Sequence, residues 1–254
     1  MMTYYDDLDN DEKRVTAFFK AIEKKVHGIC YDLGTGSGIL AKKASKYADY
    51  VYAIEQNPLI ADKTRKNLDK YDNIKFIQAD ATEYQFMENI DVVICEMLDT
   101  ALIDEEQIPV INNVIKYAAD NTEFIPMAVY STIELINSKI MGICYYEDEH
   151  PKYTSLSDEV KYGMIKLNQY NKPEYEEDIQ IKVKNGGLLN AIKITTYTIL
   201  TDEVILEPTP MLNPPLLIPV EQLNVDEGET ITINLKYTMG GGLNTIQTTR
   251  RYNK

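Results

Sequence analysis

The chain has 254 residues, enough for one large domain or two modest domains with a full hydrophobic core. It carries 26 Lys and Arg against 40 Asp and Glu, a net charge of −14, which disfavours a nucleic-acid substrate because the chain repels phosphate backbones. No apolar run reaches the roughly 18 residues of a membrane span, and the N-terminus lacks a secretion signal. The three cysteines lack disulfide or zinc-site spacing. We therefore expect a cytoplasmic protein with reduced thiols, no bound metal and no membrane partner.

The N-terminal 27 residues predict an amphipathic helix. Its apolar side chains recur at intervals of three and four and share one face: Val15, Phe18, Phe19, Ile22 and Val26. Asp9 or Asn10 is the expected N-cap, with Asp11 and Glu12 in the first turn, where acidic side chains suit the helix dipole.

From Gly28 to about residue 126, short apolar strands alternate with helical segments. The predicted strands cover residues 29–31, 50–54, 74–77 and 90–95, and the predicted helices cover residues 40–47 and 58–71. Continuous apolar strands in this β-α-β-α order predict an α/β fold with a parallel sheet covered on both faces. Ligands bind such sheets at the carboxyl ends of the strands.

A glycine-rich turn follows the first predicted strand. It contains Gly34, Gly36 and Gly38, with the carboxylate of Asp32 just before them. Glycine permits positive φ angles and close approach of the backbone to a ligand. The spacing G-x-G-x-G departs from the dinucleotide fingerprint G-x-G-x-x-G, and alone it is weak evidence because flexible loops also contain it.

Two further acids follow predicted strands and should lie at the same sheet edge as the glycine turn. Glu55 comes about 20 residues after the turn, the spacing of a carboxylate that holds a ribose 2′-hydroxyl, and it argues against a 2′-phosphate. Asp80 ends the next strand and could accept a hydrogen bond from an adenine amino group. The acids and the turn together predict an adenosine-bearing cofactor, and on these residues NAD and S-adenosylmethionine both stay open.

The segment from Asp32 to Gly38, Asp-Leu-Gly-Thr-Gly-Ser-Gly, resembles motif I of the Rossmann-like methyltransferases that use S-adenosyl-L-methionine. In that family the acidic residue and the glycines hold the amino-acid end of the cofactor. The resemblance favours S-adenosylmethionine over NAD. It implies a set of cofactor-binding residues: Asp32, Gly34, Gly36, Gly38, Glu55, Asp80 and Ala81.

A narrower resemblance, to the protein arginine methyltransferases, rests on three segments. Glu96 and Glu105 follow the fourth predicted strand at the nine-residue separation of that family's two substrate-binding glutamates. Residues 11–14, Asp-Glu-Lys-Arg, resemble its D-E-x-R, which implies that Arg14 contacts the cofactor carboxylate. Residues 124–130 resemble the I-P linker between its catalytic domain and its β-domain.

The chemistry of a glutamate pair fits a guanidinium acceptor. A guanidinium is a planar cation with five N–H donors in a fixed fork. Two converging carboxylates can clamp it bidentately and raise the electron density on the nitrogen that receives the methyl group. The resemblance therefore implies Glu96 and Glu105 as catalytic residues and an arginine-like protein side chain as methyl acceptor. On its pattern alone, without the resemblance, the segment favours a solvated acidic loop.

Beyond Pro126 the pattern changes to alternating strands. We expect a catalytic domain at residues 1–126 and an antiparallel, barrel-like β-domain at residues 127–254, which the resemblance implies as the substrate-binding part. Predicted strands cover residues 129–136, 179–183, 191–200, 204–206 and 230–237, and glycine-containing turns separate them. The polar stretch 145–175 is expected to form a helix-loop excursion.

One feature of the family is absent. Its β-domain carries a Thr-His-Trp loop beside the glutamates, whereas this chain has no tryptophan, and residues 208–215, which end in the rigid turn Asn-Pro-Pro, occupy that region. The acceptor could instead be another protein side chain or a small amine, and a non-catalytic cofactor-binding scaffold is a further alternative. The chain also lacks a clear dimerisation arm, so a homodimer and a monomer both stay open.

Overall fold

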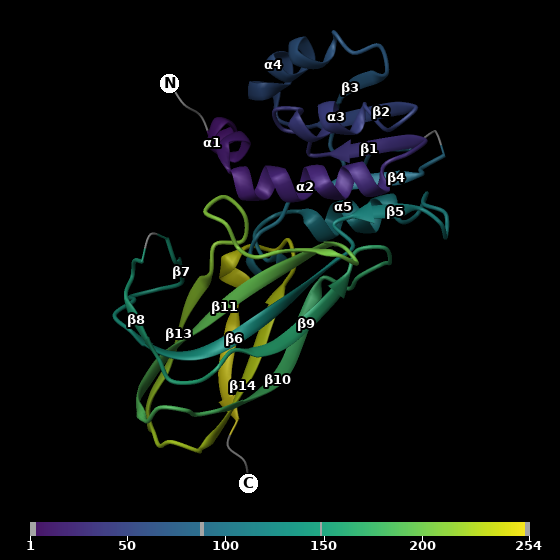
Figure 1. Cartoon of the computed structure of the whole chain (residues 1–254). Helices are drawn as coiled ribbons and strands as arrows, with labels where there is room; N and C mark the ends of the chain where they lie inside the picture. The colour runs from purple at the N-terminus through teal and green to yellow at the C-terminus, as the bar shows by residue number, and fades with distance from the viewer. Residues whose placement is uncertain (1–3, 87–88, 148, 252–254) are drawn as a thin grey trace.

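A computed structural model describes residues 4–86, 89–147 and 149–251, and it stacks a parallel sheet on a larger antiparallel part (Figure 1). The five strands of the parallel sheet lie in the order β3-β2-β1-β4-β5, and every neighbouring pair is parallel. Their bounds are β1 (Ile29–Leu33), β2 (Tyr50–Glu55), β3 (Ile74–Gln78), β4 (Val92–Cys95) and β5 (Glu123–Ile125). The predicted α/β fold class, a Rossmann-like sheet followed by antiparallel strands, is confirmed.

The helices of this part are α1 (Tyr4–Asn10), α2 (Glu12–Lys25), α3 (Ile39–Ala44), α4 (Pro58–Leu68) and α5 (Gln107–Val114), with a short 3₁₀ turn, η1 (Thr100–Leu102). Helix α2 starts after Asp11, whose side chain accepts a hydrogen bond from the backbone N–H of Arg14 at 3.1 Å. The predicted caps Asp9 and Asn10 are wrong, because these residues end the separate helix α1. None of the described helices is long and apolar enough to cross a membrane.

The antiparallel part begins with β6 at Ala128, three residues after β5 ends at Ile125. Its strands form a three-stranded sheet, β10-β14-β15, and a seven-stranded sheet, β7-β13-β11-β6-β8 with β9 and β12 attached. The bounds are β6 (Ala128–Ser138), β7 (Cys144–Tyr145), β8 (Tyr153–Ser155), β9 (Val160–Lys166), β10 (Glu174–Lys182), β11 (Gly187–Thr201), β12 (Val204–Leu206), β13 (Leu216–Val225), β14 (Thr230–Thr238) and β15 (Gln247–Arg251), with the 3₁₀ turn η2 (Leu243–Thr245) before the last strand.

The expectation of a helix-loop excursion at residues 145–175 is wrong. The described part of this stretch contains β8, β9 and the start of β10. In β9 Tyr162 is buried, while Lys161, Met164 and Lys166 are exposed, and the register of β9 with β6 shifts within the strand. Because exposed and buried positions do not alternate strictly across this shift, the period-two pattern is weak in the sequence.

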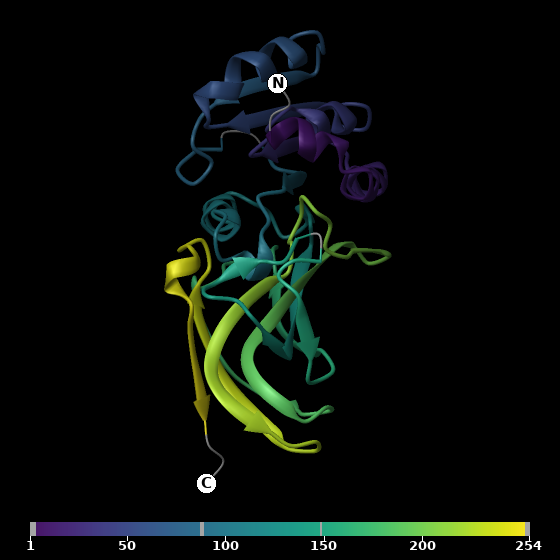
Figure 2. The same cartoon turned by 90° about the vertical axis from the view of Figure 1, so that its left-hand side faces the viewer.

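The loop after β4 joins the two parts of the molecule. The backbone N–H of Ala101 donates to Thr196 Oγ1 on β11 at 2.8 Å, and Thr100 Oγ1 donates to the carbonyl oxygen of Pro214 at 2.7 Å. On the other side, the N–H of Gly240 donates to the carbonyl oxygen of Leu102 at 2.9 Å, and Figure 2 shows the η2 turn beside α5. This loop, which carries Glu105, is thus held by the antiparallel strands.

Candidate functional site

A pocket of about 250 Å³ opens at the carboxyl ends of β1, β2 and β4. It gathers residues from the N-terminal helices, the parallel sheet and the loop before β13. Among the residues singled out from the sequence, those that line it are Arg14, Asp32, Gly34, Gly36, Glu55, Asp80, Ala81, Glu96 and Glu105. Gly38 does not line the pocket. It caps α3 with a φ of 83°, and a Cβ there would lie 2.9 Å from Leu68 on α4.

The glycine turn brings the backbone close to its neighbours. Gly34 has a φ of 70°, and a Cβ on it would lie 2.8 Å from the Cγ of Met97. Beside the turn, the buried carboxylate of Asp32 accepts a hydrogen bond from Thr35 Oγ1 at 2.5 Å. Burial raises the pKa of Asp32 to about 6, an effect that the Thr35 hydroxyl and the charge of Arg14 partly offset.

Glu55 and Asp80 stabilise the backbone at two strand ends of the pocket. Glu55 accepts from the backbone N–H of Gly36 at 3.0 Å and from that of Asn57 at 2.8 Å, so one carboxylate orders both the glycine turn and the start of α4. Asp80 is exposed, and its Oδ1 accepts from the N–H and the hydroxyl of Thr82. Since a carboxylate offers about four acceptor positions, both can accept further hydrogen bonds from a ligand.

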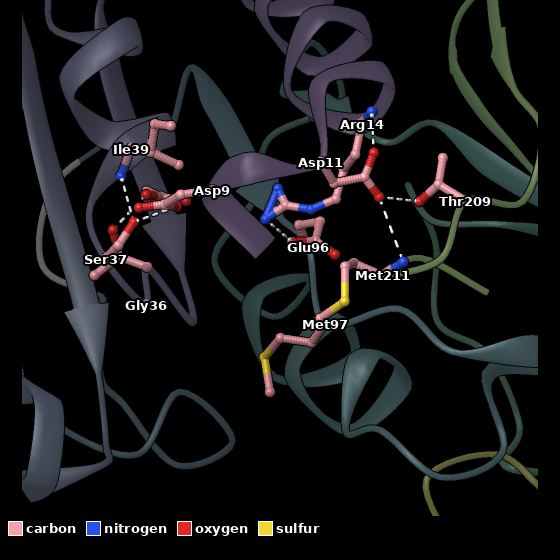
Figure 3. Close-up of polar contacts among 12 residues, drawn as sticks. Asp9, Asp11, Arg14, Gly36, Ser37, Ile39, Glu96, Met97, Thr209 and Met211 are labelled. Carbon is pink, nitrogen blue, oxygen red and sulfur yellow. Dashed lines mark hydrogen bonds and ion pairs between the residues drawn. The ribbon is translucent and has the colours of Figure 1, made fainter. Parts of the chain in front are cut away.

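Arg14 places a guanidinium with unused donors at the pocket. Its Nη2 lies 3.1 Å from Glu96 Oε2, and both side chains are largely buried (Figure 3). Its Nε and Nη1 are buried and have no hydrogen-bond partner among the described residues. Because buried donors without partners are costly, these N–H groups fit a ligand that supplies acceptor oxygens to this end of the pocket.

Hydrogen bonds that the sequence does not predict tie the N-terminal helices to the glycine turn and to the segment before β13. Ser37 Oγ donates to Asp9 Oδ1 at 2.7 Å, which ties the end of α1 to the glycine turn. Asp11 Oδ2 accepts from the hydroxyl of Thr209 and, at 3.4 Å, from the N–H of Met211 (Figure 3). Met211, from the segment of residues 208–215, also lines the pocket, and no local pattern in the sequence points to it.

Glu96 and Glu105 bring two carboxylates to the same pocket. Burial raises the pKa of Glu96 to about 7, the charge of Arg14 lowers it and the charge of Glu105 raises it further. Burial also raises the pKa of Glu105, as do its neighbours Asp104 and Glu106. Because the charge of Glu105 raises the pKa of Glu96, a positively charged ligand beside these carboxylates is favoured.

The sequence is similar to a known protein family and to several known proteins. A family model described as a methyltransferase domain matches residues 30–120. An uncharacterized protein of Methanothermobacter thermautotrophicus is 41% identical over 244 residues, 96% of each chain. The uncharacterized protein MJ1452 of Methanocaldococcus jannaschii is 40% identical over 250 residues, 96% of this chain and 95% of its own. Protein arginine N-methyltransferase 7 of Gallus gallus is 26% identical over 219 residues, 79% of this chain and 31% of its own length.

Solved structures share the fold at low identity. The Trypanosoma brucei PRMT1 enzyme-prozyme complex with AdoHcy superposes with a TM-score of 0.77 at 16% identity, over 95% of this chain and 94% of that one. Arabidopsis thaliana protein arginine methyltransferase 10 superposes with a TM-score of 0.78 at 15% identity, over 96% of this chain and 95% of that one. Both parts of the molecule therefore follow the architecture of these proteins.

The buried carboxyl of Glu96 predicts a pH dependence of stability in the cofactor-free protein. Its pKa rises from an ordinary 4.5 to about 7 on folding, so its stabilising contribution is complete below pH 4.5 and is lost as the pH rises through 7. This one group should lower the free energy of unfolding by about 3 kcal/mol at most between pH 5 and pH 8. Urea unfolding at several pH values measures how the free energy of unfolding changes with pH. This free energy should fall less steeply with pH in Glu96→Gln than in the unchanged protein, and an equal pH dependence would contradict the assignment. Glu83→Gln, at an exposed position, is the control.

Proposed function

Because the chain belongs to the class I methyltransferases that use S-adenosylmethionine and resembles the protein arginine methyltransferases, we propose that it methylates a nitrogen held by Glu96 and Glu105. One observation carries the proposal. Both glutamates line the same pocket as the glycine turn and Arg14, so an acceptor nitrogen between them would lie beside the cofactor.

The cofactor end of the pocket has a donor or acceptor for each part of S-adenosylmethionine. In this proposal an unpartnered N–H of Arg14 donates to its carboxylate, and the carboxylate of Asp32 accepts from its ammonium. Glu55 accepts from the ribose hydroxyls, and Asp80 with Ala81 borders the adenine. When bound, the cofactor supplies a methyl group on a positively charged sulfur.

The acceptor end is acidic and partly open. Glu96 is held by Arg14, so its second oxygen is free to orient an acceptor N–H, while Glu105 lies nearer the solvent. The two carboxylates would accept N–H bonds from a guanidinium and hold its lone pair toward the methyl carbon. The acceptor nitrogen loses a proton when its bond to carbon forms. Glu105, with a raised pKa and access to water, is suited to take that proton up.

The replacement of the Thr-His-Trp loop favours a second candidate within the same chemistry. Met211 lines the pocket from this segment, so a flexible thioether occupies a region where the resemblance leads one to expect His and Trp. Another protein side chain or a small amine could therefore be the acceptor. A non-catalytic cofactor-binding scaffold would need neither Glu96 nor Glu105 in the pocket.

We expect Glu55→Ala to weaken cofactor binding. The substitution removes the ribose acceptor and also releases the N–H groups of Gly36 and Asn57, so the dissociation constant for S-adenosylhomocysteine should rise at least about tenfold. Isothermal titration calorimetry measures this. Asp62→Ala, an exposed acid on α4, is the matched control, and an unchanged affinity in Glu55→Ala would rule out the assigned role.

Glu105→Gln should separate binding from transfer. The amide keeps the shape of the side chain but loses the charge that holds a cation and takes up its proton, so kcat should fall by at least about 100-fold. Affinity for S-adenosylhomocysteine should stay within about twofold, because the proposed role of Glu105 is at the acceptor end of the pocket. Full turnover by this variant would refute the glutamate clamp.

The acceptor itself can be identified by its product. Labelled cofactor is incubated with matched basic peptides that contain either arginine or lysine, and with extract of a methanogen related to the source of the curated relatives. Acid hydrolysis and mass spectrometry then identify the methylated compound. Methyl-arginine is the expected product, methyl-lysine or a methylated small amine would select the second candidate, and cofactor binding without any labelled product would favour the scaffold.

A further inference from the structure

We propose that two buried side chains, Asp99 and Gln107, set the position of Glu105 and Glu96 relative to one another and are positioning residues of the transfer reaction. The inference rests on the proposed role of the two glutamates. The chain between β4 and α5 doubles back, so it has a first arm, residues 95–99, which carries Glu96, and a second arm, residues 103–107, which carries Glu105. Asp99 and Gln107 are the two braces, because the side chain of each makes hydrogen bonds to the backbone of the opposite arm.

Asp99, on the first arm, holds the backbone of the second arm. Its Oδ2 accepts from the N–H of Ile103 at 3.1 Å and of Asp104 at 2.8 Å, and its Oδ1 accepts from the N–H of Glu105 at 3.3 Å. Asp99 is only 7% exposed. A carboxyl is costly to bury, and its three N–H partners account for its place inside the loop.

Gln107, on the second arm, holds the backbone of the first arm. Its Oε1 accepts from the N–H of Met97 at 2.9 Å, and its Nε2 donates to the carbonyl oxygen of Cys95 at 2.9 Å. These are the residues on either side of Glu96. Since Gln107 is fully buried, it fixes the direction in which the backbone presents the Glu96 side chain.

The loop needs these braces because its own backbone is irregular. Ala101 and Leu102 have positive φ angles of 59° and 58°, a conformation that side-chain-bearing residues rarely adopt in succession. Between Asp99 and Glu106 the only regular element is the three-residue turn η1. The outer contacts of the loop to Thr196 and Gly240 hold residues 101 and 102, whereas the N–H groups of 103–105 turn inward to Asp99.

A role through Glu105 can be told from a general effect on folding by a double-mutant cycle. In Asp99→Asn one amide oxygen can keep the bonds to Ile103 and Asp104, but the NH₂ group then faces the N–H of Glu105. In Gln107→Glu, one oxygen still accepts from Met97, and the other faces the carbonyl of Cys95. Asp120→Asn, an exposed acid beyond α5, is the charge control.

Transfer to an arginine-containing basic peptide is the first readout. We expect Asp99→Asn and Gln107→Glu each to lower kcat at least tenfold, with the dissociation constant for S-adenosylhomocysteine within twofold of the unchanged protein. In a Glu105→Gln background, Asp99→Asn should lower kcat less than twofold further, since residues that act as one unit are not additive. The proposal would be overturned if Asp99→Asn lowered kcat by the same factor in the unchanged protein and in Glu105→Gln, or if it did not lower kcat at all.

Amide hydrogen exchange gives a second readout that needs no acceptor. The amides of residues 103–105 should exchange at least tenfold faster in Asp99→Asn than in Asp120→Asn, and unchanged exchange would also overturn the proposal. If Glu105→Gln alone retains full kcat, the glutamate clamp fails instead. That outcome is distinct, because accelerated exchange in Asp99→Asn would still show that Asp99 holds the second arm.

Discussion

The geometry of the pocket depends on the buried ion pair between Arg14 and Glu96. Arg14 is 3% exposed in the first turns of α2, and Glu96 directly follows β4. Breaking a buried pair leaves an uncompensated charge at a cost of about 3–5 kcal/mol. The apolar face of α2, with Phe18 and Ile22 fully buried, packs the helix against the core. The ion pair holds the N-terminal end of α2 at the pocket. One contact thus joins the N-terminal helices to the parallel sheet at the site of chemistry.

Much of the parallel sheet could be predicted because its central strands β1 and β4 are buried on both faces. Runs such as Val92–Cys95 are apolar throughout, so they stand out from the helical pattern around them. The acids at the ends of these strands were expected in one crevice for the same reason, and Asp32, Glu55 and Asp80 do line one pocket. Parallel pairing brings the carboxyl ends of strands together whatever the detail of the side chains.

The remaining parts of the fold and of the site depend on contacts between residues far apart in the sequence, which a local sequence pattern does not predict. The sequence does not predict β9, because its buried and exposed positions do not alternate strictly, or α1, because it is short and acidic. Met211 reaches the pocket through contacts distant in the sequence, among them the pairing of β13 with β11 and the hydrogen bond of its N–H to Asp11. The burial of Asp99 could not be read from an acidic stretch, since Asp104 and Glu106 nearby are exposed.

The two carboxylates have a consequence for product release if the acceptor is the proposed guanidinium. Methylation would leave its positive charge in place, so the acidic pocket would attract substrate and product alike. Each added methyl group removes one N–H donor, and a hydrogen bond between charged groups is worth about 1.5–3 kcal/mol. A product that could no longer donate to both Glu96 and Glu105 would leave one carboxylate oxygen without its donor. Loss of a donor, and not loss of charge, would then let the product dissociate.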